Sequence, residues 1–333
     1  MTATRFFHFC SHEQFPPEAL LHQAAAAERA GFDGITCSDH LQPWWDGGES
    51  AHAWIWLGAA GHATERVPLG TGVTPPGPRY HPVLIAQAWA TLERLFPGRA
   101  YLGVGSGEAL NESPLGADWP PVAEQVERLE EGLGLIRRLL AGETVDHDGK
   151  HFRTKQARLH TLPERIPPIY VSAFGPKAAG VAGRLGDGVW TLGDPESVPK
   201  ILEAYRAAAS DASRESGEIV LQGGFSWAQD EEAALDSARV WKGAQPDEFY
   251  KDDWHEPGKM FEEGSRQLSD DEFRQSFIVA SDPEEHVARV RELVEMGATI
   301  VPLQNASPDP IAAISVYGER VLPELRGARA GVG

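Results

Sequence analysis

Cysteine is scarce in this sequence of 333 residues, which contains only Cys10 and Cys37. Two cysteines cannot form a disulfide framework, and their spacing is not that of a metal-binding motif. No stretch approaches the length of a membrane-spanning helix, about 18 consecutive apolar residues. The first residues also lack the basic and apolar segments of a signal peptide. We therefore expect a soluble, cytoplasmic protein in which both cysteines are small buried side chains.

Basic residues are also few: the chain has 30 Lys and Arg but 49 Asp and Glu, which gives a formal net charge of −19. A surface of this sign repels nucleic acid and anionic lipid, so we expect neither as a partner. An anionic ligand would need a local pocket lined by cations or backbone amides. The partner expected here is instead a small-molecule substrate.

Short apolar segments alternate with longer amphipathic segments along almost the whole chain. Eight segments have the composition of strands, namely 6–10, 34–37, 69–71, 101–104, 169–172, 189–191, 219–225 and 299–303. Helical patterns lie between them, at 17–30, 53–64, 82–95, 122–140, 177–185, 198–209, 231–241 and 283–296, and a last one covers 310–325. This alternation predicts an α/β protein with a (β/α)8 TIM barrel of parallel strands, and a doubly wound open sheet is the alternative.

Two stretches interrupt the alternation. Residues 145–162 are interpreted as a short hairpin insertion, and residues 242–267 are rich in charge, tryptophan, glycine and proline. The sequence shows no internal repeat and no low-complexity linker. We therefore predict a single domain over residues 1–333, with both insertions at the C-terminal face of the barrel.

Polar and titratable residues gather directly after the first four predicted strands, where a barrel enzyme carries its site. Glu13, Asp39, His40 and Glu108 are the residues of chemical interest. A histidine titrates near neutral pH, and a neighbouring carboxylate can orient it or raise its basicity. His40 is therefore the candidate acid–base group, although capping by Asp39 with a packed histidine is the structural alternative. The histidines lack close ligand spacing, so no metal is expected.

Two glycine-containing segments also follow predicted strands. Residues 103–108, Gly-Val-Gly-Ser-Gly-Glu, lack the third glycine of the dinucleotide fingerprint. Small residues there would let a planar ligand approach the backbone, and a plain tight turn is the alternative. In 173–177, Ala-Phe-Gly-Pro-Lys, the free amides of a helix start together with Lys177 predict a phosphate pocket. Helix capping alone would also explain the Gly-Pro pair.

Tryptophan is abundant, with ten residues in the chain. Trp44 and Trp45 directly follow the second predicted strand and are expected to line a pocket. Trp54 and Trp56 lie inside a helical pattern and are expected to pack in the core.

Four long motifs stand at these same places: Ser-His-Glu-Gln-Phe at 11–15, Cys-Ser-Asp-His-Leu-Gln-Pro-Trp at 37–44, Arg-Tyr-His-Pro at 79–82 and Gly-Ser-Gly-Glu-Ala-Leu-Asn-Glu at 105–112. Segments 182–188 and 278–283 add to these motifs. On all six, the chain resembles the coenzyme F420-dependent glucose-6-phosphate dehydrogenase group of the luciferase-like flavin and deazaflavin superfamily. The resemblance implies coenzyme F420, whose deazaflavin ring carries hydride at one carbon, and a homodimer. FMN in a monooxygenase or flavin oxidoreductase is the alternative, and a non-catalytic flavin or deazaflavin carrier is a third.

The resemblance also implies roles for individual residues. His40 would transfer a proton near the reactive ring carbon, Glu108 would be the second acid–base group, Glu13 a supporting carboxylate, and Trp44 would flank the substrate. The implied cofactor contacts are Asp39, the cis peptide Gly72–Val73 behind the ring, Ser106, Gly107 and Asn111 at the ring edge and polyol, and Phe174, Gly175, Lys177 and Ala178 at the phosphate. Thr74 is the expected substitute for a family hydroxyl that Pro75 replaces.

The chain departs from the resembled group where basic residues would hold a substrate phosphate. Residues 192–195, Leu-Gly-Asp-Pro, contain no cation, and Gln275 and Ser276 stand where a basic pair is implied; Lys251 keeps a third position. Losing two charge-assisted contacts of about 1.5–3 kcal/mol each would weaken phosphate binding by orders of magnitude. We therefore expect hydride transfer with an uncharged sugar, alcohol or aldehyde, held by Trp45 and Trp254 as well as Trp44, rather than with glucose 6-phosphate.

Overall fold

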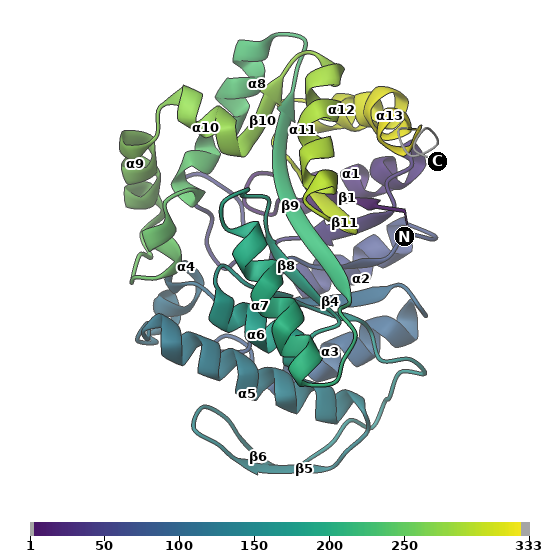
Figure 1. Cartoon of the computed structure of the whole chain (residues 1–333), viewed down its shortest axis with the longest axis vertical. Coiled ribbons are helices and arrows are strands. Elements are labelled where there is room, and N and C mark those ends of the chain that lie inside the picture. The colour runs from purple at the N-terminus through teal and green to yellow at the C-terminus, as the bar shows by residue number, and fades with distance from the viewer. Residues whose placement is uncertain (1–2, 328–333) are drawn as a thin grey trace.

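The computed structural model describes residues 3–327, and at its centre eight parallel strands form a closed barrel (Figure 1). In order around the barrel these are β1 (Arg5–Cys10), β2 (Gly34–Cys37), β3 (Leu69–Thr71), β4 (Ala100–Val104), β7 (Ile169–Ser172), β8 (Gly188–Leu192), β9 (Glu218–Trp227) and β11 (Ile300–Asn305). The pairing of β11 with β1, Ile300 opposite Arg5, closes the ring. The predicted barrel is therefore confirmed, and the open sheet is wrong.

Helices cover the outside of the barrel: α1 (Pro17–Ala30), α2 (Ala53–Ala63), α3 (Pro82–Leu95), α5 (Val122–Leu140), α6 (Pro176–Leu185), α7 (Val198–Asp211) and α11 (Pro283–Glu295). Seven helices of the fold carry a proline in the first turn, namely α1, α3, α6, α7, α9 (Pro257–Gln267), α11 and α12 (Pro310–Val316). Proline suits this position because its fixed φ matches the helix and its missing N–H has no partner there anyway. This signal explains why most helix starts agree with the predicted ones.

The last predicted helix is not continuous. After α12 the backbone widens into a π-helical turn, η4 (Tyr317–Val321), before α13 (Leu322–Gly327). None of the helices within residues 3–327 is both long and apolar enough to cross a membrane.

The two predicted insertions differ in structure. The first is the expected antiparallel hairpin, β5 (Val145–Asp148) with β6 (Arg153–Ala157). Its predicted place at the C-terminal face is wrong, because the hairpin joins the end of α5 to the start of β7 and therefore lies at the N-terminal ends of the strands. The second is helical, with η2 (Arg239–Ala244), η3 (Asp247–Tyr250) and α9 (Pro257–Gln267). Helix α8 (Glu231–Ala238) ends earlier than predicted because the backbone tightens into the 3-10 helix η2. Four further elements were not predicted: α4 (Ala109–Glu112), η1 (Ser113–Leu115), α10 (Asp270–Ser276) and β10 (Phe277–Ala280).

Strand β9 pairs with two strands, one after the other, along the same edge. Its first half pairs with β8 as far as Gln222 opposite Leu192. Its second half pairs with β10, beginning with Gly224 opposite Phe277. Beyond Gln222, this edge of β9 is therefore hydrogen-bonded to β10 instead of β8.

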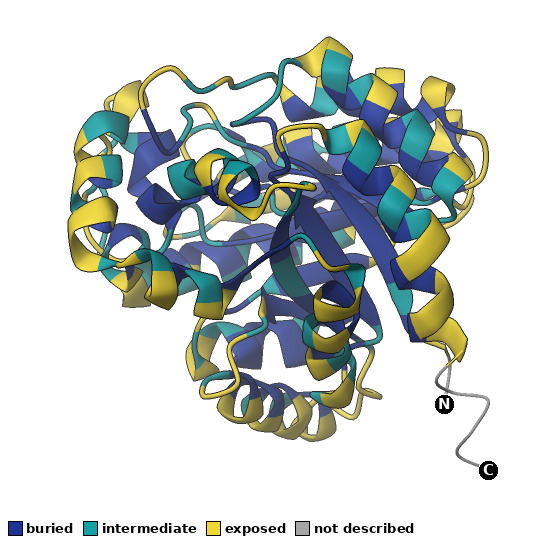
Figure 2. Ribbon diagram, turned by 90° about the horizontal axis from the view of Figure 1, so that it is seen from above, coloured by how far each residue is buried: buried dark blue, intermediate teal, exposed yellow. Residues whose placement is uncertain are grey.

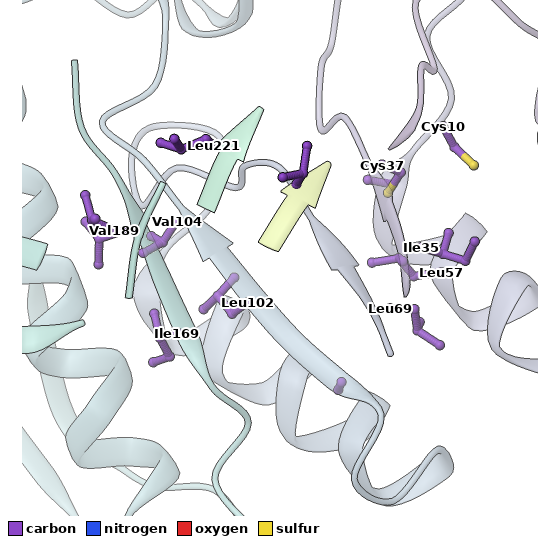
Figure 3. Close-up of a cluster of buried hydrophobic side chains, with 14 of the residues drawn as sticks. Cys10, Ile35, Cys37, Leu57, Leu69, Leu102, Val104, Ile169, Val189 and Leu221 are labelled. Carbon is purple, nitrogen blue, oxygen red and sulfur yellow. The ribbon is translucent and has the colours of Figure 1, made fainter. Parts of the chain in front are cut away.

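Apolar side chains fill both the barrel interior and the layer between barrel and helices. Figure 2 shows the buried strands in dark blue and the exposed outer faces of the helices in yellow. The interior cluster consists of Phe7, Phe9, Tyr101, Tyr170, Trp190, Val220 and Ile300. An eight-stranded barrel is just wide enough to be packed in this way. In the outer layer Cys10 and Cys37 are buried and free, as expected, beside apolar neighbours such as Ile35 (Figure 3).

Candidate active site

A cavity of about 1640 Å³ lies at the C-terminal ends of the barrel strands. Phe9 and Trp190 of the barrel interior line it. Most residues that the sequence singled out reach it from loops far apart in the chain: Glu13, Asp39, His40, Trp44, Gly72, Val73, Ser106, Gly107, Glu108, Asn111, Phe174, Gly175, Lys177, Ala178 and Lys251. Because ligand pockets are commonly about 300–1000 Å³, this cavity has room for a cofactor together with a substrate.

Glu13, His40 and Glu108, which we call the acid–base trio, meet inside this cavity. Nε2 of His40 lies 3.6 Å from Oε1 of Glu13 and 3.5 Å from Oε2 of Glu108. Nδ1 of His40 lies 3.3 Å from the carbonyl oxygen of Gln42 and 3.4 Å from Nδ2 of Asn111. An acceptor and a donor thus face Nδ1, so the imidazole finds a partner there in either neutral tautomer. Its Nε2 is left to exchange protons with the carboxyl groups.

Burial changes the proton affinity of all three members of the trio. It raises the pKa of Glu13 to about 7. Burial, reinforced by the negative charge of Glu13, raises the pKa of Glu108 to about 8. Burial, followed by the positive charge of Arg79, lowers the pKa of His40 to about 3. Near neutral pH the trio therefore contains a neutral imidazole beside carboxyl groups that can still give or take a proton, as general acid–base catalysis requires.

Asp39 lies next to the trio and is held by four side chains. Nε1 of Trp54 and Oγ1 of Thr74 donate to its Oδ2 at 3.1 and 2.5 Å, and the Tyr80 hydroxyl donates to Oδ1 at 3.3 Å. Nη1 of Arg79 lies 3.3 Å from Oδ1. Asp39 is thus fixed in one orientation. Trp54 also packs against the core, as predicted, whereas Thr74 was expected at the cofactor.

A row of aromatic rings runs along one wall of the cavity. The ring of Trp44 is centred 5.3 Å from that of His40 and 5.5 Å from that of Tyr250. Tyr250 in turn lies 5.2 Å from Phe174, and its hydroxyl donates to the carbonyl oxygen of Ala244 at 2.7 Å. The sequence patterns did not single out Tyr250. Its only signal was an aromatic side chain directly before Lys251 in the insertion.

Another part of the cavity lining is the peptide bond Gly72–Val73, which is cis as the resemblance implied. A Cβ atom at Gly72 would lie 2.6 Å from the ring of Trp190, and one at Gly105 would lie 2.6 Å from Cγ2 of Val73. Contacts this short are not tolerated, so both positions require glycine. The backbone of this part of the lining therefore packs directly against Trp190 and Val73, with no side chain between them.

A candidate anion site lies at the start of α6. Gly175 caps this helix without a side-chain hydrogen bond, and the N–H of Ala179 already bonds to the Gly175 carbonyl. The N–H groups of Lys177 and Ala178 precede the first helical hydrogen bond and are available to a ligand. The Lys177 ammonium forms no ion pair with any residue that the structure describes. Backbone amides and one cation here fit the phosphate of a cofactor.

Residues 2–299 match the family model described as Luciferase-like monooxygenase. The chain belongs to the luciferase-like monooxygenase family. It is 40% identical over 328 residues to the F420-dependent glucose-6-phosphate dehydrogenase of Microbacterium testaceum, covering 97% of both chains. It is 41% identical over 324 residues to the protein of the same name from Beutenbergia cavernae, covering 95% of this chain and 96% of the relative. The resemblance inferred from the sequence is confirmed.

Two solved structures share the fold of this chain. An F420-dependent secondary alcohol dehydrogenase, solved in complex with an F420-acetone adduct, superposes with a TM-score of 0.94 at 32% identity, over 98% of this chain and all of that chain. The F420-dependent tetrahydromethanopterin reductase of Methanopyrus kandleri superposes with a TM-score of 0.80 at 23% identity, over 97% of this chain and 100% of that chain, which supports the fold alone.

Two residues expected at the substrate do not line the cavity of this luciferase-like protein. Trp45 is buried and packs edge-on against Trp241 with ring centres 5.3 Å apart. Trp254 packs on Phe249 at 4.8 Å. Both belong to a hydrophobic cluster that anchors the second insertion. Within residues 3–327, no three His, Cys, Asp or Glu side chains are grouped so as to hold a metal ion.

Proposed function

We propose that this protein is an F420-dependent dehydrogenase that transfers hydride between F420 and a small uncharged alcohol or its carbonyl counterpart. The observation that carries the proposal is the acid–base trio, Glu13, His40 and Glu108, assembled in a large cavity beside Trp44. A non-catalytic carrier has no use for three converging proton-transfer groups. The names of the relatives at 40% and 41% identity support F420 as the cofactor, and so does the name of the solved structure at 32%.

The residues present fit the cofactor. Gly72, Val73, Ser106, Gly107 and Asn111 would hold its ring and polyol chain, and Asp39 would contact the ring from the side of the trio. Phe174, Gly175, Lys177 and Ala178 would hold its phosphate. When bound, F420 supplies a ring carbon that accepts a hydride from a substrate carbon or returns it.

The side chains of the trio move the proton that accompanies the hydride. In alcohol oxidation, His40 or Glu108 accepts the hydroxyl proton, and in carbonyl reduction the protonated group returns it. Glu13 lies on the same side of the imidazole as Glu108 and stabilises a proton held there. The rings of Trp44 and Tyr250 cover this region and limit the access of water.

The cations on the substrate side are already engaged. Nζ of Lys251 pairs with Asp247 at 3.0 Å. The guanidinium of Arg289 donates to the backbone carbonyl of Arg274 at 3.1 Å, and Arg274 itself pairs with Glu231 at 2.8 Å. A phosphate dianion bound there would lose water with little compensation, which is costly.

Neutral or acidic groups line the two places where the resembled group would hold a phosphate. Gln275 and Ser276 line the cavity, and so does Asp194 in the loop after β8. The carboxylate of Asp194 accepts hydrogen bonds from the backbone N–H of Ser197 at 2.8 Å and of Glu196 at 3.3 Å, which favour its charged form. These residues support an uncharged substrate.

The proposal is tested by comparing kcat/KM for a secondary alcohol, its ketone, glucose and glucose 6-phosphate, each with F420 and each with FMN. We expect turnover with F420 and at least 10²-fold lower kcat/KM for glucose 6-phosphate than for the best neutral substrate, since two charge-assisted contacts are missing. A micromolar KM for glucose 6-phosphate would overturn the substrate proposal. Turnover with FMN alone would favour the flavin alternative.

Reversing the charge at the start of α6 is expected to weaken cofactor binding. Lys177→Glu places a negative charge beside amides that would otherwise attract the phosphate, so the Kd for F420 should rise about tenfold or more, and most at low ionic strength. Quenching of protein fluorescence measures this Kd. Lys155→Glu on the distant hairpin strand β6 makes the same charge change and should leave the Kd unaltered. Equal affinities in both variants would place the phosphate elsewhere.

The quaternary structure and location belong to the same proposal. We propose a cytoplasmic homodimer, and the exposed side chains of Ile55 on α2 and Leu84 on α3 support an apolar contact surface. Light scattering of the purified protein would give twice the mass of one chain.

A further inference from the structure

We propose that Arg79 is the positioning residue of the acid–base trio, because it clamps the peptide that carries His40 and joins it to the helix start that carries Glu108. This inference rests on the proposed function, since it concerns how the same proton-transfer groups are held. Arg79 follows β3, and no member of the trio does.

The first half of the clamp is the contact of Arg79 with the loop after β2. Nη2 of Arg79 donates to the backbone carbonyl oxygen of Asp39 at 2.5 Å. This carbonyl belongs to the peptide bond that leads into His40, so the guanidinium fixes the peptide plane from which the imidazole projects. Nη1 of Arg79 lies 3.3 Å from Oδ1 of the same aspartate, Asp39. Two contacts from one planar group to one residue restrict its rotation, as the fork geometry of arginine allows and lysine does not.

The second half of the clamp reaches α4. The backbone N–H of Arg79 donates to Oε2 of Glu112 at 3.0 Å, and its Nε lies 3.8 Å from Oε1. Glu112 is one helical turn from Glu108, and its backbone N–H bonds to the Glu108 carbonyl. The guanidinium also lies over the ring of Tyr80 at 4.6 Å. Arg79 therefore ties together the two strand ends that bring His40 and Glu108 within 3.5 Å of each other.

Arg79 also places a buried positive charge among acidic neighbours. Its side chain is only 8% exposed. The titratable and charged groups that surround the trio are Glu13 and His12 after β1, Asp39 after β2, His52 before α2, Tyr80 after β3, Glu108 and Glu112 after β4, Arg128 on α5 and Tyr250 in η3. Next to burial, the Arg79 charge is the main influence that lowers the pKa of His40, and it also lowers that of Glu108. Substitutions of Arg79 can therefore separate the effect of its positioning contacts from the effect of its positive charge.

The test uses two substitutions and the pH profile of kcat/KM for the best alcohol. Arg79→Met removes both the clamp and the charge, so we expect a profile shifted upward by about one pH unit, because His40 and Glu108 then hold protons more tightly. Arg79→Lys keeps the charge but loses the fork, so we expect an unshifted profile with kcat reduced about tenfold and KM changed little.

Arg137 offers a matched control. It lies on α5, where its Nη2 is 2.8 Å from Asp187 and its Nε donates to the Leu185 carbonyl, so it also contacts a carboxylate and a backbone carbonyl, but of two different residues and outside the cavity. Arg137→Met should lower the thermal stability without moving the profile. If Arg79→Met behaves like Arg137→Met, with lower stability and an unshifted profile, the proposal is overturned.

A second readout separates this inference from the proposed function. In the protein without cofactor, the His40 ring is followed by NMR of 15N-labelled histidine and is identified by its loss in His40→Asn. We expect His40 to begin protonating at higher pH in Arg79→Met than in the unaltered protein or in Arg79→Lys. This result would support the inference even if no alcohol were oxidised with F420, in which case the proposed function alone would fail. Identical titrations in all three proteins would refute the role of Arg79.

Discussion

His40→Ala is expected to lower kcat for alcohol oxidation by about 10²–10⁴-fold while the Kd for F420 changes little. The imidazole lies between the two carboxyl groups, within 3.6 Å of each. Its removal therefore breaks the route by which a proton leaves the substrate. The backbone around it stays fixed, because the Asp39 contacts with Trp54 and Thr74 do not involve the imidazole. Stopped-flow absorbance of F420 reports the chemical step, and fluorescence quenching reports the Kd.

His62→Ala is the matched control for this experiment. His62 is an exposed residue of α2 that packs on Phe96 away from the cavity, so its loss should leave kcat unchanged. If His40→Ala turned over as fast as His62→Ala, proton transfer would have to be assigned to Glu108 alone. If both the kcat and the F420 affinity collapsed, His40 would be a structural part of the cofactor site.

Glu108→Gln is expected to change both the rate and its pH dependence. For alcohol oxidation, kcat/KM should rise with pH as the base is freed, with a midpoint between about 7 and 8, where the raised pKa values of Glu13 and Glu108 lie. Carbonyl reduction needs the protonated group and should fall over the same range. With glutamine at 108 the rate should drop about 10²–10⁴-fold, and the remaining midpoint should move down towards the pKa of Glu13, about 7.

A downward shift of the pH midpoint in Glu108→Gln distinguishes a role of Glu108 in proton transfer from a general loss of activity. Burial favours the neutral form of a carboxyl group, so only a group with a raised pKa can still donate a proton at pH 7. Glu124→Gln on α5 is the control, since Glu124 is half-buried at the start of that helix and does not line the cavity. An unchanged midpoint in Glu108→Gln would mean that another group controls the profile.

Much of the fold was predictable because local signals and the barrel agree. Apolar strands recur between helices whose first turns carry proline, as at Pro82 and Pro283. The parts that were not predicted lack such a signal. β10 is a four-residue strand after an insertion, and it is defined by its pairing with β9, a contact that the sequence does not display. The π-helical turn at Tyr317 likewise depends on packing, since the ring of Tyr317 packs at a tilt on that of Phe225, with centroids 4.1 Å apart.

The candidate site was predictable where residue type alone carries chemistry, as for Glu13, His40 and Glu108. It was not predictable where the role of a residue depends on the direction in which its side chain points. Trp44 and Trp45 are neighbours with the same side chain, yet one lines the cavity and the other packs on Trp241. In an irregular segment no periodicity tells which of two adjacent residues faces the ligand.

The split pairing of β9 means that the two sides of the cavity are supported by different strand pairings. The proton-transfer groups come from the ends of β1, β2 and β4, within the first 108 residues, and are locked to strands that pair along their length. The other side is built from β10 and the insertion that supplies Tyr250, where β9 pairs with β10 instead of β8. The second insertion contributes no strand to the closed ring of eight. Under the function proposed above, we therefore expect substitutions in this insertion to change the selectivity for the substrate more than the proton transfer.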